Sequence, residues 1–524
     1  MLDERLETLF QDDIIAALKG RLIGLEKESL RAAADGHIAQ TPHPSSLGSA
    51  LTHPSITTDF SEALLELITP PMDSVASAMH ELRLLHQYVY QNIGDEMLWA
   101  TSMPCLLSGE ESIPIADYGK SNAGMMKTVY RRGLVWRYGK VMQAIAGVHF
   151  NFSLPQTFWK HYQKIEKNSE DLQTFINANY FSMLRNLQRV GWLIPYLFGA
   201  SPAVCESFLN GHPTTLSYLG QGTYYEPFAT SLRMGDIGYT NKKESGAGVK
   251  ACYDDLESYT RFMKAATETV CPEYERIGVK VDGEYRQLNA FQLQIENEYY
   301  SSVRPKSVPA YLQKPTHALQ QNGVQYIELR SLDVNAFEPL GVSENQLYFM
   351  EALMLYVLLR PDSLISCSES NDIDDNLSLV AHCGRDPDLR LRRTDGLIRL
   401  RDWADEILAD MQGVCELLDA TMHAPVYSLA LAAQWEKVYQ PELTPSAKMM
   451  SIIQENKESF FEFSLRTSQQ YKDWFCSQRM PVEKQIVLDN LARKSQQEQT
   501  EIEASDEIDF DTFLEKYFSQ QKLS

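Results

Sequence analysis

Acidic, imidazole and arginine side chains recur on alternate positions of several short segments that have the pattern of β-strands. Residues two apart in a strand point to the same face of its sheet, so each pair would project together while apolar neighbours face the other way. The pairs are Glu26 and Glu28 in GLEKES, His149 and Asn151 in GVHFNF, and Glu328 and Arg330 in YIELRS.

These strands would form a site only if they shared one sheet. Their carboxylates would then repel one another unless cations neutralised them, and oxygen-rich ligand sets with one imidazole suit Mg²⁺ or Mn²⁺. Glu66 in ALLELIT adds a carboxylate flanked by apolar residues, a costly place for an unpaired charge. Divalent cations beside an arginine suit phosphate chemistry. For any one strand, a polar face that meets water is the more common explanation.

The usual phosphate-binding loops are absent from the sequence. There is no GxxxxGK[ST], and the glycines of SGAGVK (245–250) do not form GxGxxG. A nucleotide would therefore be held by metal ions and individual side chains. Arg304 and Lys306, which flank Pro305 near the end of a predicted strand, are candidates for this role. A surface turn with two solvated cations is the alternative.

The overall charge limits the possible partners. Acidic residues number 70 and basic residues 48, which gives a net charge of −22. Such a surface repels nucleic acid and anionic membranes, so neither is expected as a partner. The N-terminus lacks the basic start and apolar stretch of a signal peptide, and the longest apolar runs, 191–204 and 348–359, are too short to cross a bilayer. We expect a soluble, cytoplasmic protein.

Eight cysteines are scattered along the chain without a CxxC pair. This spacing favours neither a zinc site nor a disulfide framework, and indicates free thiols in a reducing compartment. Cys367 and Cys383 lie in one polar region and could pair under oxidation, although free thiols are the simpler expectation.

Hydrophobic spacing predicts helices in the first part of the chain at 1–20, 74–93, 124–146, 173–197 and 253–269. Strands are expected at 21–31, 147–155, 291–305 and 324–334, with a Gly- and Tyr-rich loop at 219–241. From about residue 344 the pattern is helical, at 344–360, 398–420, 425–438 and 446–457.

This order of elements predicts an α+β fold with an antiparallel sheet. The polar segment 367–390 is the best candidate for a mobile loop, and 482–519 for a surface helix or a partly disordered tail. We expect one unit over 1–524, with a sheet-rich catalytic core (1–345), a mainly helical part (346–480) and a charged C-terminal tail (481–524).

An ordered set of motifs resembles the proteobacterial type of glutamate–cysteine ligase. It comprises GLEKESLR, GSALTHPSITTDFSEALLELITP, GDEMLWATSMPC, GVHFNFSLP, GWLIPYLFGASPAVC, ATSLRMGDIGYTN, LQIENEYYSSVRPK and YIELRSLDVNAFEPLGV. The resemblance is specific from about residue 20 to 345 and looser to about 500, and segment 367–395 matches poorly. It implies a glutamine synthetase-like catalytic fold, in which a curved antiparallel sheet forms a funnel-shaped active site with helices outside.

The resemblance also implies roles for individual residues. The implied metal ligands are Glu26, Glu28, Asp59, Glu66, His149 and Glu328. The implied substrate-binding residues, most of them around the cysteine, are Phe60, Tyr130, Leu134, Gln143, Asn151, Arg233, Tyr239, Tyr300 and Arg330. Glu328 and Arg330 are the implied catalytic residues. Arg233 can hold a carboxylate through its planar fork, although each tyrosine taken singly is more often part of a core.

The reaction implied is ATP-dependent. ATP would phosphorylate the side-chain carboxylate of L-glutamate, and the amine of L-cysteine would attack the acyl phosphate, with Mg²⁺ or Mn²⁺ bound. The chain leaves no room for an ATP-grasp domain, so we expect γ-glutamylcysteine as the product, and a monomer. The alternatives are ligation to another amine, metal-dependent hydrolysis without ATP, and a non-catalytic acidic interaction protein.

Overall fold

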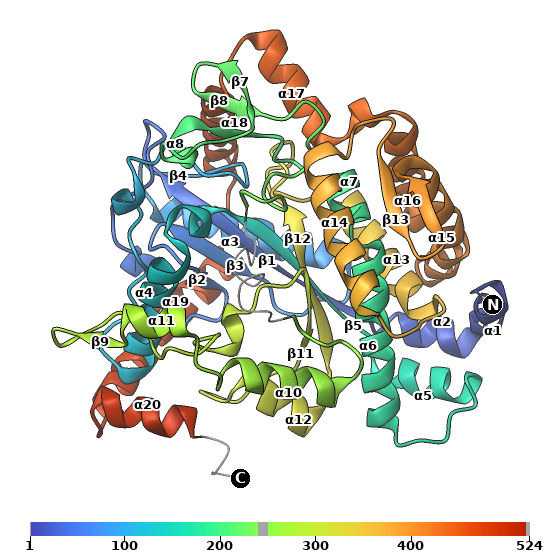
Figure 1. Cartoon of the computed structure of the whole chain (residues 1–524), viewed down its shortest axis with the longest axis horizontal. Helices are drawn as coiled ribbons and strands as arrows, with labels where there is room; N and C mark the ends of the chain where they lie inside the picture. The colour runs from blue at the N-terminus through green and yellow to red at the C-terminus, as the bar shows by residue number, and fades with distance from the viewer. Residues whose placement is uncertain (1, 239–249, 520–524) are drawn as a thin grey trace.

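The computed structural model describes residues 2–238 and 250–519 (Figure 1). An antiparallel sheet lies at its centre, with the strand order β11-β12-β5-β1-β3-β2 and with β4 paired to β1. The strands are β1 (Leu22–Ala32), β2 (Ile56–Thr58), β3 (Leu64–Ile68), β4 (Met97–Leu98), β5 (Gly147–Ser153), β11 (Val303–Lys306) and β12 (Tyr326–Asp333). The predicted α+β fold with an antiparallel sheet is confirmed.

Helices surround this sheet (Figure 1). In the first part of the chain they are α1 (Leu2–Leu9), α2 (Asp12–Leu18), α3 (Val75–Asn92), α4 (Asn122–Tyr138), α5 (Gln156–Ile165), α6 (Leu172–Val190), α7 (Leu193–Phe198), α8 (Glu206–Leu209), α10 (Leu256–Ala266), α11 (Pro272–Ile277) and α12 (Pro315–Asn322). Later helices are α13 (Glu344–Leu359), α14 (Cys367–Cys383), α15 (Leu400–Met422), α16 (Val426–Tyr439), α17 (Pro445–Asn456), α18 (Phe460–Ser477), α19 (Val482–Ser505) and α20 (Phe510–Phe518).

Three small sheets complete the described part of the fold. They are β6 (Ala203–Cys205) with β8 (Thr223–Tyr225) and β7 (Ser217–Gly220), the hairpin β9 (Lys280–Val281) and β10 (Glu284–Tyr285), and the hairpin β13 (Arg390–Arg393) and β14 (Gly396–Arg399). Two of these differ from the expectations. Strands β7 and β8 lie within and beside the segment expected to be a loop, and β13–β14 interrupts the part expected to be helical.

One face of the sheet supplies the core. On β5, Val148, Phe150 and Phe152 are almost fully buried and belong to one cluster with Leu25 of β1 and Leu353 of α13. This is the alternation expected from GVHFNF, and it leaves the polar residues of the same strands on the opposite face. Helix α13 is mostly apolar and is buried on all sides, as expected of a helix enclosed by others.

Several predicted helices proved to be shorter or divided. The helix expected at 1–20 is two helices, because Gln11 has an extended backbone with φ −122° and ψ 143°. The helix expected at 124–146 ends at Tyr138, where Gly139 adopts a φ of 83° that favours glycine. The segment 173–197 contains α6 and α7, divided at Gly191.

The strand expected at 291–305 was largely wrong. Only Val303–Lys306 forms a strand, and 296–298 form a turn of 3₁₀ helix. Local side chains take up backbone N–H groups that a strand would pair: Asn289 Oδ1 accepts from Phe291 N at 3.0 Å, and Glu298 Oε2 from Gln294 N at 2.7 Å.

The mobile loop expected at 367–390 was also wrong, since most of it is helix α14. Ser366 caps this helix by accepting from Glu369 N at 3.2 Å. Cys367 and Cys383 stand at its two ends, about 24 Å apart at 1.5 Å per residue, so they cannot form a disulfide with each other.

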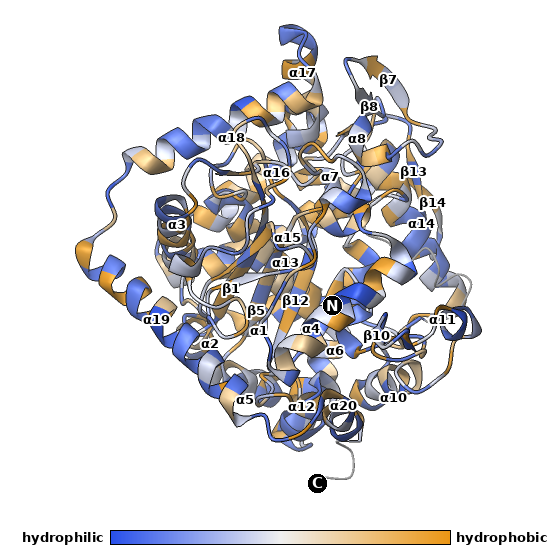
Figure 2. Cartoon of the chain, turned by 90° about the vertical axis from the view of Figure 1, so that its left-hand side faces the viewer, coloured by the Kyte–Doolittle hydropathy of each residue, from blue (hydrophilic) through white to orange (hydrophobic). Residues whose placement is uncertain are grey.

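The C-terminal segment is helical. Figure 2 shows α19 along the outer edge of the molecule. Helix α20 packs through Phe510, Leu514 and Tyr517 against Met126 and Val129 of α4. Within 2–238 and 250–519, no helix has the length and apolar character that crossing a membrane requires.

Candidate functional site

The polar face of the central sheet gathers the carboxylates expected from the strand pattern. The strand register places Glu26 of β1 opposite His149 of β5, and Glu28 of β1 opposite Glu66 of β3. On the other side of β5, Glu328 of β12 lies opposite Asn151. The condition set by the sequence, that these strands share one sheet, is therefore met.

His149 lies at the centre of this group. Its Nδ1 is 3.1 Å from Glu26 Oε2 and 3.6 Å from Glu328 Oε1, and its Nε2 is 3.7 Å from Glu28 Oε1. One ligand atom each from Glu26, Glu66 and His149 lie within 4.8 Å of one another, which is close enough for a shared metal ion. Asn151 Nδ2 donates to Glu26 Oε1 at 2.8 Å.

The pKa values of the carboxylates are pushed apart. Burial raises the pKa of Glu66 well above its usual range, and the like charges of Glu26, Asp59 and Glu28 add to this effect. Burial also raises the pKa of Glu28, against the opposing effect of His149. Several buried carboxylates this close cannot all ionise without added positive charge. The cluster therefore has the electrostatics of a cation site.

Two of the glutamates keep low pKa values. For Glu26, burial is outweighed chiefly by its hydrogen bond with His149, so the pKa is lowered. For Glu328, burial is outweighed by Lys306 and Arg330, so the pKa lies well below the usual range. Lys306 Nζ is 3.4 Å from Glu328 Oε2, and Arg330 Nη1 is 3.3 Å from Glu328 Oε1.

The donor set fits a hard divalent cation. It consists of carboxylate oxygens with one imidazole, as Mg²⁺ or Mn²⁺ prefers. Glu328 Oε2 is buried and accepts no hydrogen bond from the described residues, so it keeps lone pairs for another partner. Asp59 follows β2, and its charge raises the pKa values of both Glu28 and Glu66, which places it near the cluster.

Arg233 is held at the margin of the cluster by backbone and carboxylate contacts. Its Nη2 donates to the carbonyl of Arg330 at 2.8 Å, and its Nη1 is 3.7 Å from Asp333 Oδ1. Asp333 is buried and also accepts from Ser201 Oγ at 2.6 Å, Ser231 Oγ at 2.9 Å and Ala200 N at 2.8 Å. The guanidinium is therefore fixed in one orientation.

Gly147 lies next to both Arg233 and the carboxylate of Glu28. Its N–H donates to Glu28 Oε2 at 2.6 Å, and a Cβ at this position would stand 2.0 Å from Arg233 Nη2. Sequence reasoning did not single out Gly147 or Asp333. The only available signal was their place at the ends of two strands that also carry site residues.

The other residues of the expected substrate pocket lie in varied surroundings. Phe60 and Leu134 are buried in the main core, and Tyr130 packs against it. Tyr300 donates to Met234 Sδ at 3.6 Å, and Arg233 Nη1 lies 3.4 Å from the same sulfur, so Tyr300 and Arg233 both contact one side chain.

Gln143 and Tyr239 are the two remaining residues of the expected cysteine pocket. Gln143 is buried, and its Oε1 has no hydrogen-bond partner among the described residues. Tyr239 lies outside the described residues.

Arg304 and Lys306 differ in their contacts. Arg304 is largely buried and donates to the carbonyls of Asn297 and Tyr299, so it supports the loop before β11. Lys306 instead faces Glu328, and the carboxylates of Glu328 and Glu26 raise the pKa of Lys306 against the effect of burial. The predicted nucleotide contacts of both residues remain predictions.

Comparison with known proteins matches this architecture to one family. The family model described as glutamate–cysteine ligase matches residues 6–380. A glutamate–cysteine ligase of Alcanivorax borkumensis is 46% identical over 523 residues and covers 99% of both chains. One from Pseudomonas putida (strain W619) is 45% identical over 517 residues, covering 99% of this chain and 98% of that protein.

Solved structures agree with the sequence comparisons. The glutamate–cysteine ligase of Francisella tularensis in complex with AMP superposes with a TM-score of 0.88 at 36% identity, over 96% of this chain and 98% of that one. A bifunctional glutathione synthetase from Pasteurella multocida shares the fold, with a TM-score of 0.72 at 24% identity, over 93% of this chain and 58% of that one. With the matching family model and relatives of nearly the same length, the chain belongs to the glutamate–cysteine ligase family.

Proposed function

We propose that this enzyme joins the γ-carboxylate of L-glutamate to the amine of L-cysteine at the polar face of the central sheet, with ATP consumed and a γ-glutamyl phosphate intermediate. This is the first step of glutathione biosynthesis. The observation that carries the assignment to this face is the group of carboxylates around His149, with Arg330 beside it, in a chain of this family.

Glu26, Glu28, Asp59, Glu66, His149 and Glu328 would hold the divalent cations, Mg²⁺ or Mn²⁺. The raised pKa of Glu66 supports this assignment, because the cluster lacks the positive charge that would keep all its members ionised. When bound, the cations supply charge that neutralises phosphate oxygens and lets two anionic substrates approach each other.

Arg330 is the residue best placed to stabilise negative charge on the transferring phosphoryl group. It projects from the same strand face as Glu328, and its contact at 3.3 Å keeps it at the cluster. Lys306 approaches Glu328 from the neighbouring edge strand and would contact a nucleotide phosphate. Asn151 is held by Glu26 and keeps a buried Oδ1 without a hydrogen-bond partner among the described residues, which suits a bond from the glutamate amine.

Arg233 would read the carboxylate of the cysteine. A guanidinium binds carboxylate through two parallel hydrogen bonds, and its value depends on a fixed orientation. Asp333 and the carbonyl of Arg330 provide that orientation. The contact of Tyr300 with Met234 brings an aromatic side chain to the same place, where it would enclose a small thiol side chain together with Phe60, Tyr130, Leu134, Gln143 and Tyr239.

The two steps balance without a covalent enzyme intermediate. A glutamate γ-carboxylate oxygen attacks the γ-phosphorus of ATP, and the bond to ADP breaks. The cysteine nitrogen then attacks the acyl carbon, phosphate leaves, and the nitrogen loses a proton. The residues named above bind and orient the reactants and stabilise charge, which accounts for most catalysis in phosphoryl transfer.

The chain would work as one unit with small molecules as its partners. We propose a monomer in the cytoplasm that binds neither nucleic acid nor membrane, because its net charge of −22 repels both kinds of anion. Residues 1–345 would form the catalytic core, with 346–480 and 481–524 as its helical part and tail. Size-exclusion chromatography with light scattering tests the monomer, and an apparent mass of twice 59.7 kDa would contradict it.

The decisive experiment is an assay of phosphate release. Release should require glutamate, cysteine, ATP and Mg²⁺ together. Glu328→Gln should lower the rate by roughly 100-fold or more, since it removes charge at the reacting groups. Glu296→Gln is the matched control, because Glu296 is a half-buried carboxylate that instead accepts from Thr316 N at 2.8 Å.

Each alternative predicts a different outcome of this assay. Equal rates with cysteine and with a simple amine that lacks a carboxylate would contradict cysteine as the acceptor. Turnover without ATP would indicate a hydrolase. A full rate for Glu328→Gln would remove the cluster from the mechanism.

A further inference from the structure

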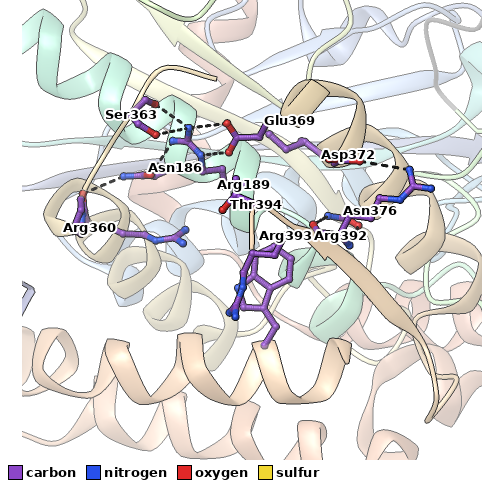
Figure 3. A pocket seen from close by; sticks show the side chains of 13 residues that line it. Asn186, Arg189, Arg360, Ser363, Glu369, Asp372, Asn376, Arg392, Arg393 and Thr394 are labelled. Atoms are coloured by element: carbon purple, nitrogen blue, oxygen red, sulfur yellow. Dashed lines mark hydrogen bonds and ion pairs between the residues drawn. The ribbon is translucent and has the colours of Figure 1, made fainter. Parts of the chain in front are cut away.

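A cavity lies away from the central sheet, and four of the residues that line it are arginines (Figure 3). Its volume is about 200 Å³, many times the roughly 15 Å³ that one water needs. The walls come from α6, the end of α13 with the segment after it, α14, the β13–β14 hairpin and α15. We call it the arginine cavity, after Arg189, Arg360, Arg392 and Arg393.

Three of these arginines already have carboxylate partners. Arg189 Nε donates to Glu369 Oε1 at 2.6 Å (Figure 3). Arg392 Nη1 donates to Asp375 Oδ2 at 2.6 Å, and Arg393 Nε donates to Asp395 Oδ1 at 2.6 Å. These pairs neutralise most of the charge of the three arginines, and Glu369 itself lines the cavity together with Asp372.

Arg360 differs from the other three. Its carbonyl accepts from Asn186 Nδ2 at 3.2 Å, but its Nη1 is buried and has no hydrogen-bond partner among the described residues. A guanidinium nitrogen removed from water without an acceptor is costly. Arg360 lines the cavity and has no carboxylate within ion-pair distance among the described residues, so an anion in the cavity would lie beside an uncompensated positive charge.

The rest of the lining would complete the recognition of a small anion. Thr394 and the guanidinium of Arg393 also line the cavity, and Arg393 stands 5.9 Å from the ring of Trp403. Trp403 is itself almost fully buried, which closes this side with an apolar surface. The combination of an unsatisfied guanidinium, further donors and one flat apolar wall is typical of a site for a compact ligand with one anionic group.

We propose that the arginine cavity binds a small oxyanion, a carboxylate or a phosphate, through Arg360. Both classes present oxygen acceptors that a guanidinium binds in the same way. None of the lining residues belongs to the central sheet, so this site is separate from the carboxylates around His149.

Titration calorimetry on the full chain tests the proposal, with inorganic phosphate and succinate as the two probes. Adenylyl imidodiphosphate and Mg²⁺ are kept saturating, so that the nucleotide site takes no phosphate. At least one probe should bind wild-type enzyme, and Arg360→Gln should weaken that binding by about 10- to 100-fold, as expected for lost hydrogen bonds to a charged group. Which probe binds identifies the class of ligand.

Arg390→Gln is the matched control, because Arg390 is an exposed arginine of the same hairpin that does not line the cavity. It should bind the probe as the wild type does, and Arg360→Lys should recover part of the affinity. Thermal unfolding of each variant verifies its fold, so that weak binding is not confused with unfolding. Two results would overturn the proposal: no binding of either probe to folded wild-type enzyme, or the same affinity in folded Arg360→Gln.

Discussion

The contact between Gly147 and Arg233 predicts a defect confined to one substrate. In Gly147→Ala the new Cβ would stand 2.0 Å from Arg233 Nη2, so the guanidinium must move. If Arg233 binds the carboxylate of the cysteine, displacing its fork loses one or two charge-assisted hydrogen bonds, at about 1.5–3 kcal/mol each. We therefore expect the KM for cysteine to rise by about 10- to 100-fold.

Initial rates with each substrate varied in turn separate this effect from general damage. The KM values for glutamate and ATP should change by less than about threefold, because the atoms nearest to a Cβ at position 147 belong to Arg233 and not to the proposed ligands of these two substrates. Gly24→Ala is the matched control, since its Cβ would meet Asn151 only at an ordinary 3.6 Å. An unchanged KM for cysteine in Gly147→Ala, with Tm near that of the wild type, would refute the assignment of Arg233.

Three further predictions concern charge and stability. Burial and neighbouring like charges raise the pKa of Glu66, so Glu66→Gln should raise Tm in EDTA. The same substitution should weaken the stabilisation by Mg²⁺. A lower Tm in EDTA would contradict this prediction. Burial lowers the pKa of His53 to about 4, so the unfolded state binds more protons below pH 6.5 and stability falls from there toward pH 4. His53→Asn keeps an acceptor for the backbone, and it should reduce the loss of unfolding free energy between pH 7 and pH 5, measured by denaturant unfolding. An equal loss in the variant would exclude His53 as its cause. Glu351→Ala should cost roughly 3–5 kcal/mol in the same measurement, because it strands the buried Arg21, and Arg21→Met with Glu351→Leu should cost less than Glu351→Ala alone.

The sequence predicted the facing of the site residues because that property is local. Alternation in GLEKES and GVHFNF is enough to place Glu26 and His149 on polar faces, whichever strands lie beside them. That the strands are neighbours is not local. The pairing of β5 with both β1 and β12 joins segments more than a hundred residues apart, and it entered the expectations only through the family resemblance.

The errors occurred where tertiary contacts outweigh local composition. The Ser-, Asp- and Asn-rich segment after residue 366 has a weak helical preference, yet α14 forms there. Its partners lie elsewhere in the chain: Glu369 pairs with Arg189 of α6, and Asp375 with Arg392 of β13. In the same way, the segment before β11 alternates like a strand but is held as a loop by Arg137, which donates to Glu298 Oε1 at 2.8 Å.

The sequence pattern did not predict that Asp333 would hold Arg233, and the reason is geometric. Between Leu329 and Leu332 the register of β12 against β5 shifts, so strict alternation no longer tells which way Asp333 points. After this irregularity Asp333 Oδ1 lies 3.7 Å from Arg233 Nη1, while Glu328 stays with the carboxylates around His149. One strand thereby serves the proposed phosphoryl-transfer and cysteine sites at once, and a bulge beside an active site has this use of redirecting a side chain. It follows that the backbone of β12 sets the distance between the two sites. Substitutions that remove the bulge should therefore impair the transfer from the phosphorylation of glutamate to the attack by cysteine more than they impair the binding of either substrate.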